Sequence, residues 1–345
     1  MEFIRIDGSY GEGGGQIART AVTLSAITKK PIEIVNIRAK RENPGLRPQH
    51  VNAINAVASL CDAQVENIRV GSDTIKFIPK EMRNDSLKVD VGTAGSVTLI
   101  LQTVIPAASL SGKRVSVELR GGTDVPWSPT LDYLRFVVQP AFSMVGIDFD
   151  IDVQRRGYYP VGGGIVKAAI EPCTNPNTFD MIKAPKIEPA MVSVCASLPA
   201  HVAQRQIAAA LSILQKSGVA CNSYSASVEQ SSSPGSSILV YAVSNFGPFI
   251  GGDAIGERGK RAEHVGTEAA EKFLVAYNSN APVDEHLADM IVLPLCLANG
   301  KSRFVVNKAS QHLNTNLYVT SKIVGCKYEI GKADGNYMVT IEGGT

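Results

Sequence analysis

The sequence predicts a mixed α+β or α/β fold, in which three β-α-β-α-β-β repeats form a large domain and a smaller α/β domain is inserted. One observation is a recurring order of apolar helix, basic turn and strand in residues 12–38, 92–120 and 285–306. The other is spacing: Lys30 and Lys113, at matching places in two copies, are 83 residues apart, whereas Lys113 and Lys301 are 188 apart. The excess predicts an inserted domain at 185–278, with 1–184 plus 279–345 forming the large domain.

Each repeat begins with a small-residue or apolar helix and continues into a strand. The helices are expected from about residue 17 and over 97–110 and 285–298, and the strands over 31–38, 115–120 and 303–306. A second helix follows each strand, at 48–63, 129–144 and 312–324. Two strands then close the unit, for example 65–70 with 74–78, and 327–330 with 337–341. Periodicity of apolar positions distinguishes helix from strand.

The inserted segment has its own pattern of elements. Strands are expected at 191–198, 221–230 and 238–244, and helices at about 203–216 and 262–277. The Ser/Gly/Pro run 231–237 is interpreted as a hairpin loop rather than a linker. Both ends of the insertion fall in Pro-rich or Asn/Ser/Pro-rich stretches, 183–189 and 278–282, as domain boundaries do.

Composition indicates a soluble, globular chain without a strong charge bias. The net charge is +2 over 345 residues, and 19% of residues are charged, which neither requires nor excludes nucleic acid. A nucleic-acid contact would be local, and Arg38, Lys40, Arg41 and Arg47 gather within ten residues. The same cluster is also compatible with a solvated basic loop.

The cysteines and the apolar runs indicate in which cellular compartment the protein is expected. Six scattered cysteines without a C-x-x-C pair, most in apolar surroundings, predict buried thiols rather than zinc ligands or disulfides. No charged-then-apolar signal segment opens the sequence, and no apolar run reaches membrane-spanning length. We expect a cytoplasmic protein with no membrane partner.

The segment from Asp7 to Arg19 is rich in glycine and contains the carboxylate Glu12. Glycines let a backbone approach a ligand closely, and the helix that follows offers unpaired N–H groups to an anion. A glutamate there would repel phosphate unless a divalent cation lay between them. The segment therefore predicts a metal-phosphate site. Gln16 stands where the third glycine of a dinucleotide fingerprint belongs, and no P-loop motif occurs.

The turns before the three second helices are polar, and repeated modules would bring their helix N-termini to one rim suited to a polyanion. Histidines are few, at positions 50, 201, 264, 286 and 312. A neutral imidazole is a competent nucleophile that can carry a phosphoryl or nucleotidyl group. His312 stands at an expected helix start, and His286 and Asp289 share a helix face. On spacing alone, a lone histidine is more often a structural or capping residue.

Seven motifs, in order along the whole chain, resemble the RNA 3′-terminal phosphate cyclase family. They are G-E-G-G-G-Q-I-x-R from Gly11, the basic segment 38–50 with P-G-L-x-x-Q-H, G-T-A-G-S with Gln102, G-G-T-D-x-P from Gly121, Y-P-x-G-G-G from Tyr159, H-L-A-D from His286, and Q-H-L-x-T-N from Gln311. The resemblance implies the family's fold, insertion included. It also implies an ATP-dependent enzyme that converts an RNA 3′-phosphate to a 2′,3′-cyclic phosphate.

The resemblance further implies a route through a covalent histidyl-AMP and an RNA(3′)pp(5′)A intermediate. Adenylylation supplies AMP as the leaving group that a phosphate monoester lacks. The implied substrates are ATP and an RNA with a 3′-phosphate end. The implied cofactor is a divalent metal, Mg²⁺ or Mn²⁺, and a homo-oligomer is compatible with the sequence.

Matched position by position, the family resemblance assigns roles to single residues. His312 matches the nucleophile and Glu12 the metal ligand. The nucleotide- or phosphate-binding positions are Arg19, Arg38, Gln49, Gln102, Pro129, His286 and Asp289. Within this set, Pro129 and His286 would face opposite sides of the adenine, and Asp289 would bond the nucleoside. Lys40, Arg41 and Arg47 are candidates for the RNA backbone.

Two positions depart from the bacterial relatives, which tend to have tyrosine at His286 and glutamine at Met290. An imidazole can stack on adenine, but a methionine cannot replace an amide hydrogen bond, so base recognition would differ here.

Two alternatives stay open. One is a non-catalytic, cyclase-like RNA-binding factor for ribosome assembly, which would lack the histidine; the other is a relative of the enolpyruvyl transferases, which use similar modules.

Overall fold

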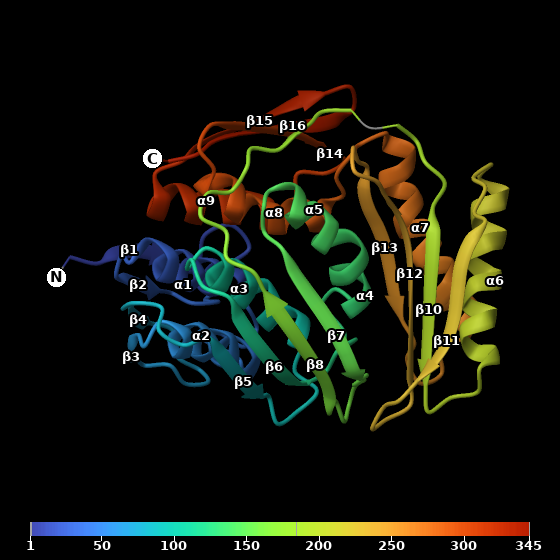
Figure 1. Ribbon diagram of the computed structural model, residues 1–345, viewed down its shortest axis with the longest axis horizontal. Coiled ribbons are helices and arrows are strands. Elements are labelled where there is room, and N and C mark those ends of the chain that lie inside the picture. Colours follow the sequence, from blue (N-terminus) through green and yellow to red (C-terminus); the bar gives the residue numbers. More distant parts are fainter. Residues whose placement is uncertain (1, 184, 345) are drawn as a thin grey trace.

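The computed structural model describes residues 2–183 and 185–344 as a mixed α+β fold (Figure 1). The strands form four sheets of four strands each. Residue 184, which marks the expected domain boundary, and the terminal residues 1 and 345 lie outside the described residues. Within the described chain, no helix is both long and apolar enough to span a lipid bilayer.

Three of the sheets share one strand order. In each, the first strand in the sequence runs parallel to the second, and the two later strands are antiparallel to their neighbours. The first sheet is β1 (Ile4–Asp7), β2 (Ile32–Val35), β4 (Ile75–Ile78) and β3 (Gln64–Glu66). The second is β5 (Ser86–Asp90), β6 (Val115–Gly121), β8 (Gly164–Ile170) and β7 (Phe149–Arg155). The third is β15 (Lys327–Ala333), β16 (Asn336–Glu342), β14 (Lys301–Val306) and β9 (Asp180–Met181).

The helices associated with these sheets pack against one another at the centre of the molecule (Figure 1). They are α1 (Gln16–Thr28), α2 (Pro48–Leu60), α3 (Val97–Ser109), α8 (Glu285–Leu297) and α9 (Gln311–Val324). Helix α1 contacts α2, α3 and α9, and α8 contacts α9. Their buried faces and the inner faces of the sheets form one hydrophobic cluster, which holds these helices in place.

Side-chain caps determine where several of these helices begin. Ser96 Oγ accepts from Leu99 N at the start of α3, and Ser310 Oγ accepts from Leu313 N at the start of α9. The N-cap of α8 is Asp284, whose carboxylate accepts from two backbone N–H groups. Each cap satisfies an N–H that has no partner within its helix. The expected starts of these three helices agree with the structure to within one residue.

The helix expected over 129–144 is not regular. It begins as α4 (Leu131–Tyr133), continues as a π-helical segment (Leu134–Val138) and ends as α5 (Gln139–Met144). Pro140 has no N–H to donate to the carbonyl four residues earlier, so the α-helical ladder is interrupted beside it.

The fourth sheet lies at one side of the molecule, covered by α6 (His201–Lys216) and α7 (Ala262–Ser279) (Figure 1). Its strands are β11 (Ser223–Glu229), β10 (Ala190–Ala196), β12 (Gly235–Val243) and β13 (Phe249–Ile255), in that order. Most buried residues of these elements form a second hydrophobic cluster, whereas Leu239 of β12 and Phe249 of β13 belong to the main one. The prediction of a hairpin loop at 231–237 is wrong. Strands β11 and β12, which flank this segment, do not pair with each other, because β10 lies between them and pairs with both.

An extended ion-pair network joins this sheet to the turn before α4. The Arg156 side chain, which is 1% exposed, donates from Nη1 to Asp124 Oδ2 (3.3 Å), from Nη2 to Asp132 Oδ1 (2.9 Å) and from Nε to Glu229 Oε2 (2.8 Å). Glu229 belongs to β11. A buried guanidinium with three carboxylate partners is well compensated, whereas Asp124 without Arg156 would be an uncompensated buried charge.

We expect Arg156→Ala to lower the free energy of unfolding by about 3–5 kcal/mol, because it leaves the buried Asp124 carboxylate without a cation and leaves Asp132 with Arg135 alone. Urea denaturation followed by circular dichroism measures the change. The matched control is Arg205→Ala, which removes an exposed ion pair with Glu263 and should have no measurable effect. Equal effects of the two substitutions would contradict this account of the network.

Candidate active site

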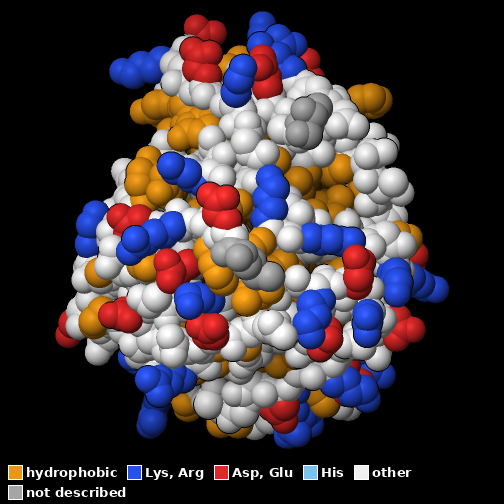
Figure 2. Space-filling view, turned by 90° about the vertical axis from the view of Figure 1, so that its left-hand side faces the viewer, with side chains coloured by type: hydrophobic (Ala, Val, Ile, Leu, Met, Phe, Trp, Pro, Cys, Tyr) orange, Lys and Arg blue, Asp and Glu red, His pale blue; other side chains and the backbone are white. Residues whose placement is uncertain are grey.

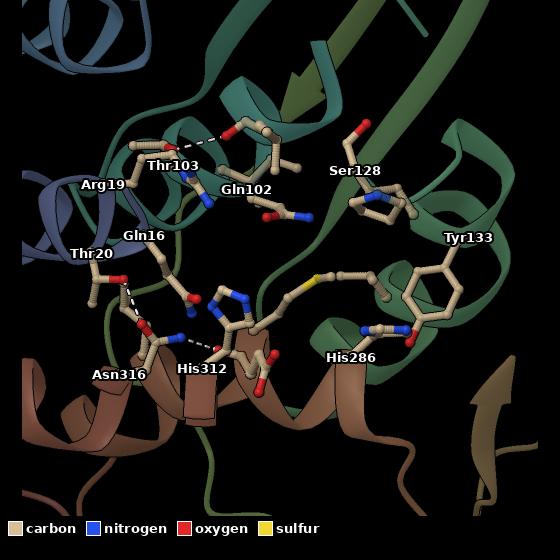
Figure 3. A pocket seen from close by; sticks show the side chains of 18 of the residues that line it. Gln16, Arg19, Thr20, Gln102, Thr103, Ser128, Tyr133, His286, His312 and Asn316 are labelled. Atoms are coloured by element: carbon tan, nitrogen blue, oxygen red, sulfur yellow. Dashed lines mark hydrogen bonds between the residues drawn. The ribbon is translucent and has the colours of Figure 1, made fainter. Parts of the chain in front are cut away.

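A cavity of about 530 Å³ opens between the central helices and the fourth sheet. Its walls come from α1, α3, the turn before α4, α8 and α9, with Asp253 of β13 and Lys272 of α7 completing it. Figure 3 shows Arg19 and Gln102 on one side, His312 near the centre and His286 with Tyr133 on the far side. The volume suits a small organic ligand.

His312 occupies the first turn of α9, directly after the cap Ser310 and Gln311. Its side chain is 47% exposed and faces the cavity. Partial burial lowers the pKa of His312; the Glu12 carboxylate opposes this, while Arg19 and Arg41 add to the lowering. The neutral imidazole, which is the nucleophilic form, is therefore favoured at neutral pH.

Glu12 lies beside His312 on the glycine-rich loop before α1. Its Oε1 is 3.1 Å from His312 Nε2 and 3.1 Å from Arg41 Nη2. Neither contact has hydrogen-bond geometry, and this buried oxygen has no hydrogen-bonding partner among the described residues. A buried carboxylate oxygen with free lone pairs is a suitable ligand for a hard divalent cation, which takes one or two carboxylates and completes its shell with phosphate and water.

The loop needs glycine where it approaches the two side chains. A Cβ added to Gly14 would lie 3.1 Å from Glu12 Oε1 and 3.8 Å from His312 Cε1. A Cβ added to Gly15 would lie 2.0 Å from His50 Nε2, which no side chain could tolerate. The glycines therefore allow α1 to begin directly against this part of the site.

Arg19 brings a cation to the cavity wall from the first turns of α1. Burial lowers its pKa to about 10, so the guanidinium remains charged at neutral pH. It forms no ion pair with another described residue. Gln102 lines the same cavity, and its Nε2 is buried without a hydrogen-bonding partner within the described chain. Both groups are donors available to an anionic ligand.

The opposite wall offers an imidazole, a proline and a carboxyl group. His286 lies edge-on to Tyr133, with ring centroids 6.3 Å apart, and Pro129 lies in the turn before α4. Asp289 accepts from Ser310 Oγ. Burial raises the pKa of Asp289 well above its usual value, which favours a protonated carboxyl that can donate a hydrogen bond. Asn316 donates to Asp289 O and accepts from Thr20 Oγ1, which joins α9 to α8 and α1.

The basic segment 38–50 lies outside the cavity lining. Arg38 donates to the carbonyls of Asn43 and Gly45, and Lys40 donates to Gly11 O. Burial lowers the pKa of His50 to about 3, and the charges of Arg19, Arg38 and Arg47 contribute to the lowering. These three cations therefore lie near His50. Gln49 is half-buried and lies outside the cavity lining.

The structure brings Arg19, Gln102, Pro129, His286, Asp289 and His312 to one cavity. Glu12 and Arg41 lie directly behind His312. Sequence reasoning missed Thr20 and Asn316, although Asn316 belongs to the Q-H-L-x-T-N motif. It also missed Asp253 and Lys272, for which no local pattern gives a signal. All six cysteines are free and buried, which confirms that expectation.

Comparison with known proteins identifies the family. The model of the family described as RNA 3′-terminal phosphate cyclase matches residues 10–330. The RNA 3′-terminal phosphate cyclase of Pyrobaculum neutrophilum is 43% identical over 341 residues, covering 99% of this chain and 98% of that protein. The protein of the same name from Pyrococcus furiosus is 44% identical over 328 residues, covering 95% of each. This chain therefore belongs to the RNA 3′-terminal phosphate cyclase family.

Proposed function

We propose that this protein is an ATP-dependent RNA 3′-terminal phosphate cyclase, which converts an RNA 3′-phosphate into a 2′,3′-cyclic phosphate. The observation that carries the proposal is His312, which faces the cavity with a lowered pKa and lies 3.1 Å from Glu12. Family membership supports the same activity.

In the first step, the lone pair of the neutral His312 imidazole attacks the α-phosphorus of ATP. A nitrogen–phosphorus bond forms, and the bond to pyrophosphate breaks. Arg19 and Gln102 would bind phosphate oxygens, because both present unpaired donors to the cavity. The position of His312 at the N-terminus of α9 adds the favourable field of the helix dipole for the transferred phosphate.

In the second step, an oxygen of the RNA 3′-phosphate attacks the AMP phosphorus, and the bond to His312 breaks. The product is RNA(3′)pp(5′)A. The neighbouring 2′-hydroxyl then attacks the 3′-phosphorus, loses its proton and releases AMP, leaving the cyclic phosphate. His312 returns to its neutral form and can react again.

The adenosine would lie against the wall opposite Arg19. Pro129 and His286 would stack on the two faces of the base, as proline and imidazole rings can. Asp289, whose raised pKa favours the carboxyl form, would donate to the nucleoside. Met290 also lines the cavity and has no hydrogen-bonding group for the base.

Glu12 would hold Mg²⁺ or Mn²⁺ through Oε1, which accepts no hydrogen bond from the described residues, and the cation would neutralise charge on the phosphates of ATP. No group of three or more His, Cys, Asp or Glu side chains suited to a metal occurs in the described ranges. A single carboxylate is compatible with a cation shared with a nucleotide, which supplies further oxygen ligands.

The basic segment would receive the RNA. Lys40, Arg41 and Arg47 are exposed, and Arg41 is next to the Glu12 carboxylate. Arg38 and Gln49 would contribute phosphate contacts from the same segment. On the face shown in Figure 2, basic side chains are interspersed with acidic ones, which supports a local contact rather than a broad basic surface.

We also propose that the three sheets of equal strand order, with their helices, are copies of one β-α-β-α-β-β module. Residues 185–278 would then be a domain inserted between the second and third copies. The separate hydrophobic cluster of the fourth sheet supports this division. A cytoplasmic location and a homo-oligomer stay predictions from the sequence.

The activity is tested with a single-stranded oligoribonucleotide bearing a 3′-phosphate. With ATP and Mg²⁺ or Mn²⁺, the wild type should convert the 3′-phosphate of this oligonucleotide into a cyclic phosphate, which phosphatase cannot remove. The same oligonucleotide with a terminal 2′-deoxyribose lacks the attacking hydroxyl and should stop at the adenylylated end, which also resists phosphatase but keeps the AMP and so retains label from α-³²P ATP, whereas the cyclic end retains none. His312→Asn, which keeps a planar polar side chain but removes the nucleophilic imidazole, should abolish conversion.

A folded wild type that leaves every end phosphatase-sensitive, with either metal, would contradict the enzymatic proposal. Retained binding of the oligonucleotide in that case would favour the alternative, a non-catalytic RNA-binding factor for ribosome assembly. Circular dichroism establishes that the protein is folded.

The charges around His312 predict how its pKa responds to substitution. Glu12→Gln should lower the pKa of His312 further, because the carboxylate stabilises the imidazolium. Arg41→Gln should raise it, because a repelling cation is removed. Protonation inactivates the nucleophile. In the wild type, the rate of adenylylation should therefore fall only at pH values below the usual imidazole pKa. In Arg41→Gln, the rate should fall at a higher pH than in the wild type. NMR titration of the five histidines measures these shifts, and identical His312 titrations in all three proteins would contradict the electrostatic account.

A further inference from the structure

Trp127, the only tryptophan of the chain, is exposed to an unusual degree. The residue is 97% exposed, and its backbone has a φ of 61°. A bulky residue in this left-handed region is strained, and such strain persists where the surrounding structure imposes it. Neither hydrophobic burial nor backbone preference explains why an indole occupies this position.

The turn that carries Trp127 is anchored on both sides. Ser128 Oγ donates to Val125 O (2.9 Å), and Thr130 N donates to Asp253 Oδ2 of β13 (2.7 Å). Trp127 lies at the edge of the cavity, two residues before Pro129. In Figure 3, Ser128 lies on the wall away from His312, which places this turn at the nucleoside end of the cavity.

A cation lines the same cavity. Lys272 lines the cavity from α7, and its Nζ donates to Asp253 O (2.9 Å). The Lys272 side chain is 48% exposed and also pairs with Glu268 (2.8 Å). Asp253 therefore connects the two features, since it accepts from Thr130 on one side and Lys272 donates to it on the other. An exposed aromatic ring and a half-exposed ammonium that line one cavity are the kinds of group by which proteins bind single-stranded nucleic acid.

We propose that Trp127 stacks on a nucleobase of the RNA substrate near its 3′ end, while Lys272 faces the RNA backbone. The inference rests on the proposed function and deepens it, because it adds a second RNA contact besides the basic segment 38–50. A base on Trp127 would lie outside the cavity, since the ring is in solvent. ATP, held inside between Pro129 and His286, would leave this ring free for the longer substrate.

Intrinsic fluorescence tests the proposal directly, because Trp127 is the only tryptophan. A single-stranded oligoribonucleotide with a 3′-phosphate, added without ATP, should quench the emission saturably. ATP added alone should leave the emission nearly unchanged. Saturable quenching by ATP but not by RNA would overturn the proposal and assign the indole to the nucleotide.

Kinetics give an independent measurement. Trp127→Ala should raise KM for the RNA about 5- to 150-fold, as expected for loss of one stacked base, with a smaller change in kcat. Trp127→Phe should recover part of the loss, because a phenyl ring also stacks. The matched control is Phe246→Ala, which removes another exposed aromatic, 79% exposed, that does not line the cavity, and should leave both constants unchanged. Lys272→Met should reduce the slope of log affinity against log salt by about 1.

Failure of this inference is distinguishable from failure of the proposed function. A wild type that forms cyclic ends, with the same RNA KM in Trp127→Ala as in Phe246→Ala, would overturn the inference alone. A wild type that forms no cyclic ends would overturn the proposed function, and the quenching experiment would still decide whether RNA covers Trp127.

Discussion

The contact between Glu12 and His312 is the constraint on which the rest of the site depends. It joins the glycine-rich loop before α1 to the first turn of α9, with Oε1 and Nε2 3.1 Å apart. The loop comes this close because Gly14 and Gly15 have no side chains to hold it away. Packing of α1 on α9, and the hydrogen bond from Thr20 to Asn316, hold the two segments together. The contact thus depends on the fold of the whole helical centre.

The electrostatic requirements of the site are opposed, and its geometry balances them. A nucleophilic imidazole must be neutral, yet a phosphate site must be positively charged. Burial together with Arg19 and Arg41 lowers the pKa of His312, while Glu12 raises it. In the proposed mechanism the same arginines would attract phosphate. The cations therefore serve both requirements, and the carboxylate would become available to a metal once phosphate arrives.

Much of this arrangement could be predicted from the sequence, because it depends on local signals. The starts of α3, α8 and α9 follow from capping residues and apolar periodicity, and the chain-long series of motifs located His312, Glu12 and Arg19. Strand β13 was missed, because Gly251 and Gly252 interrupt its apolar pattern. Those glycines allow close packing: a Cβ at Gly252 would lie 2.3 Å from Phe273 N of α7. Asp253 and Lys272 could not be placed at the cavity, because their positions depend on how the fourth sheet meets the turn before α4.

The central claim is that His312 carries AMP during the reaction. It is tested most directly by incubating the protein with ATP labelled with ³²P at the α-phosphate and a divalent metal, followed by denaturing electrophoresis and peptide mapping. The account predicts an acid-labile, alkali-stable label on the peptide that contains His312, and none in His312→Asn. Label on another residue, or full labelling of the variant, would contradict it.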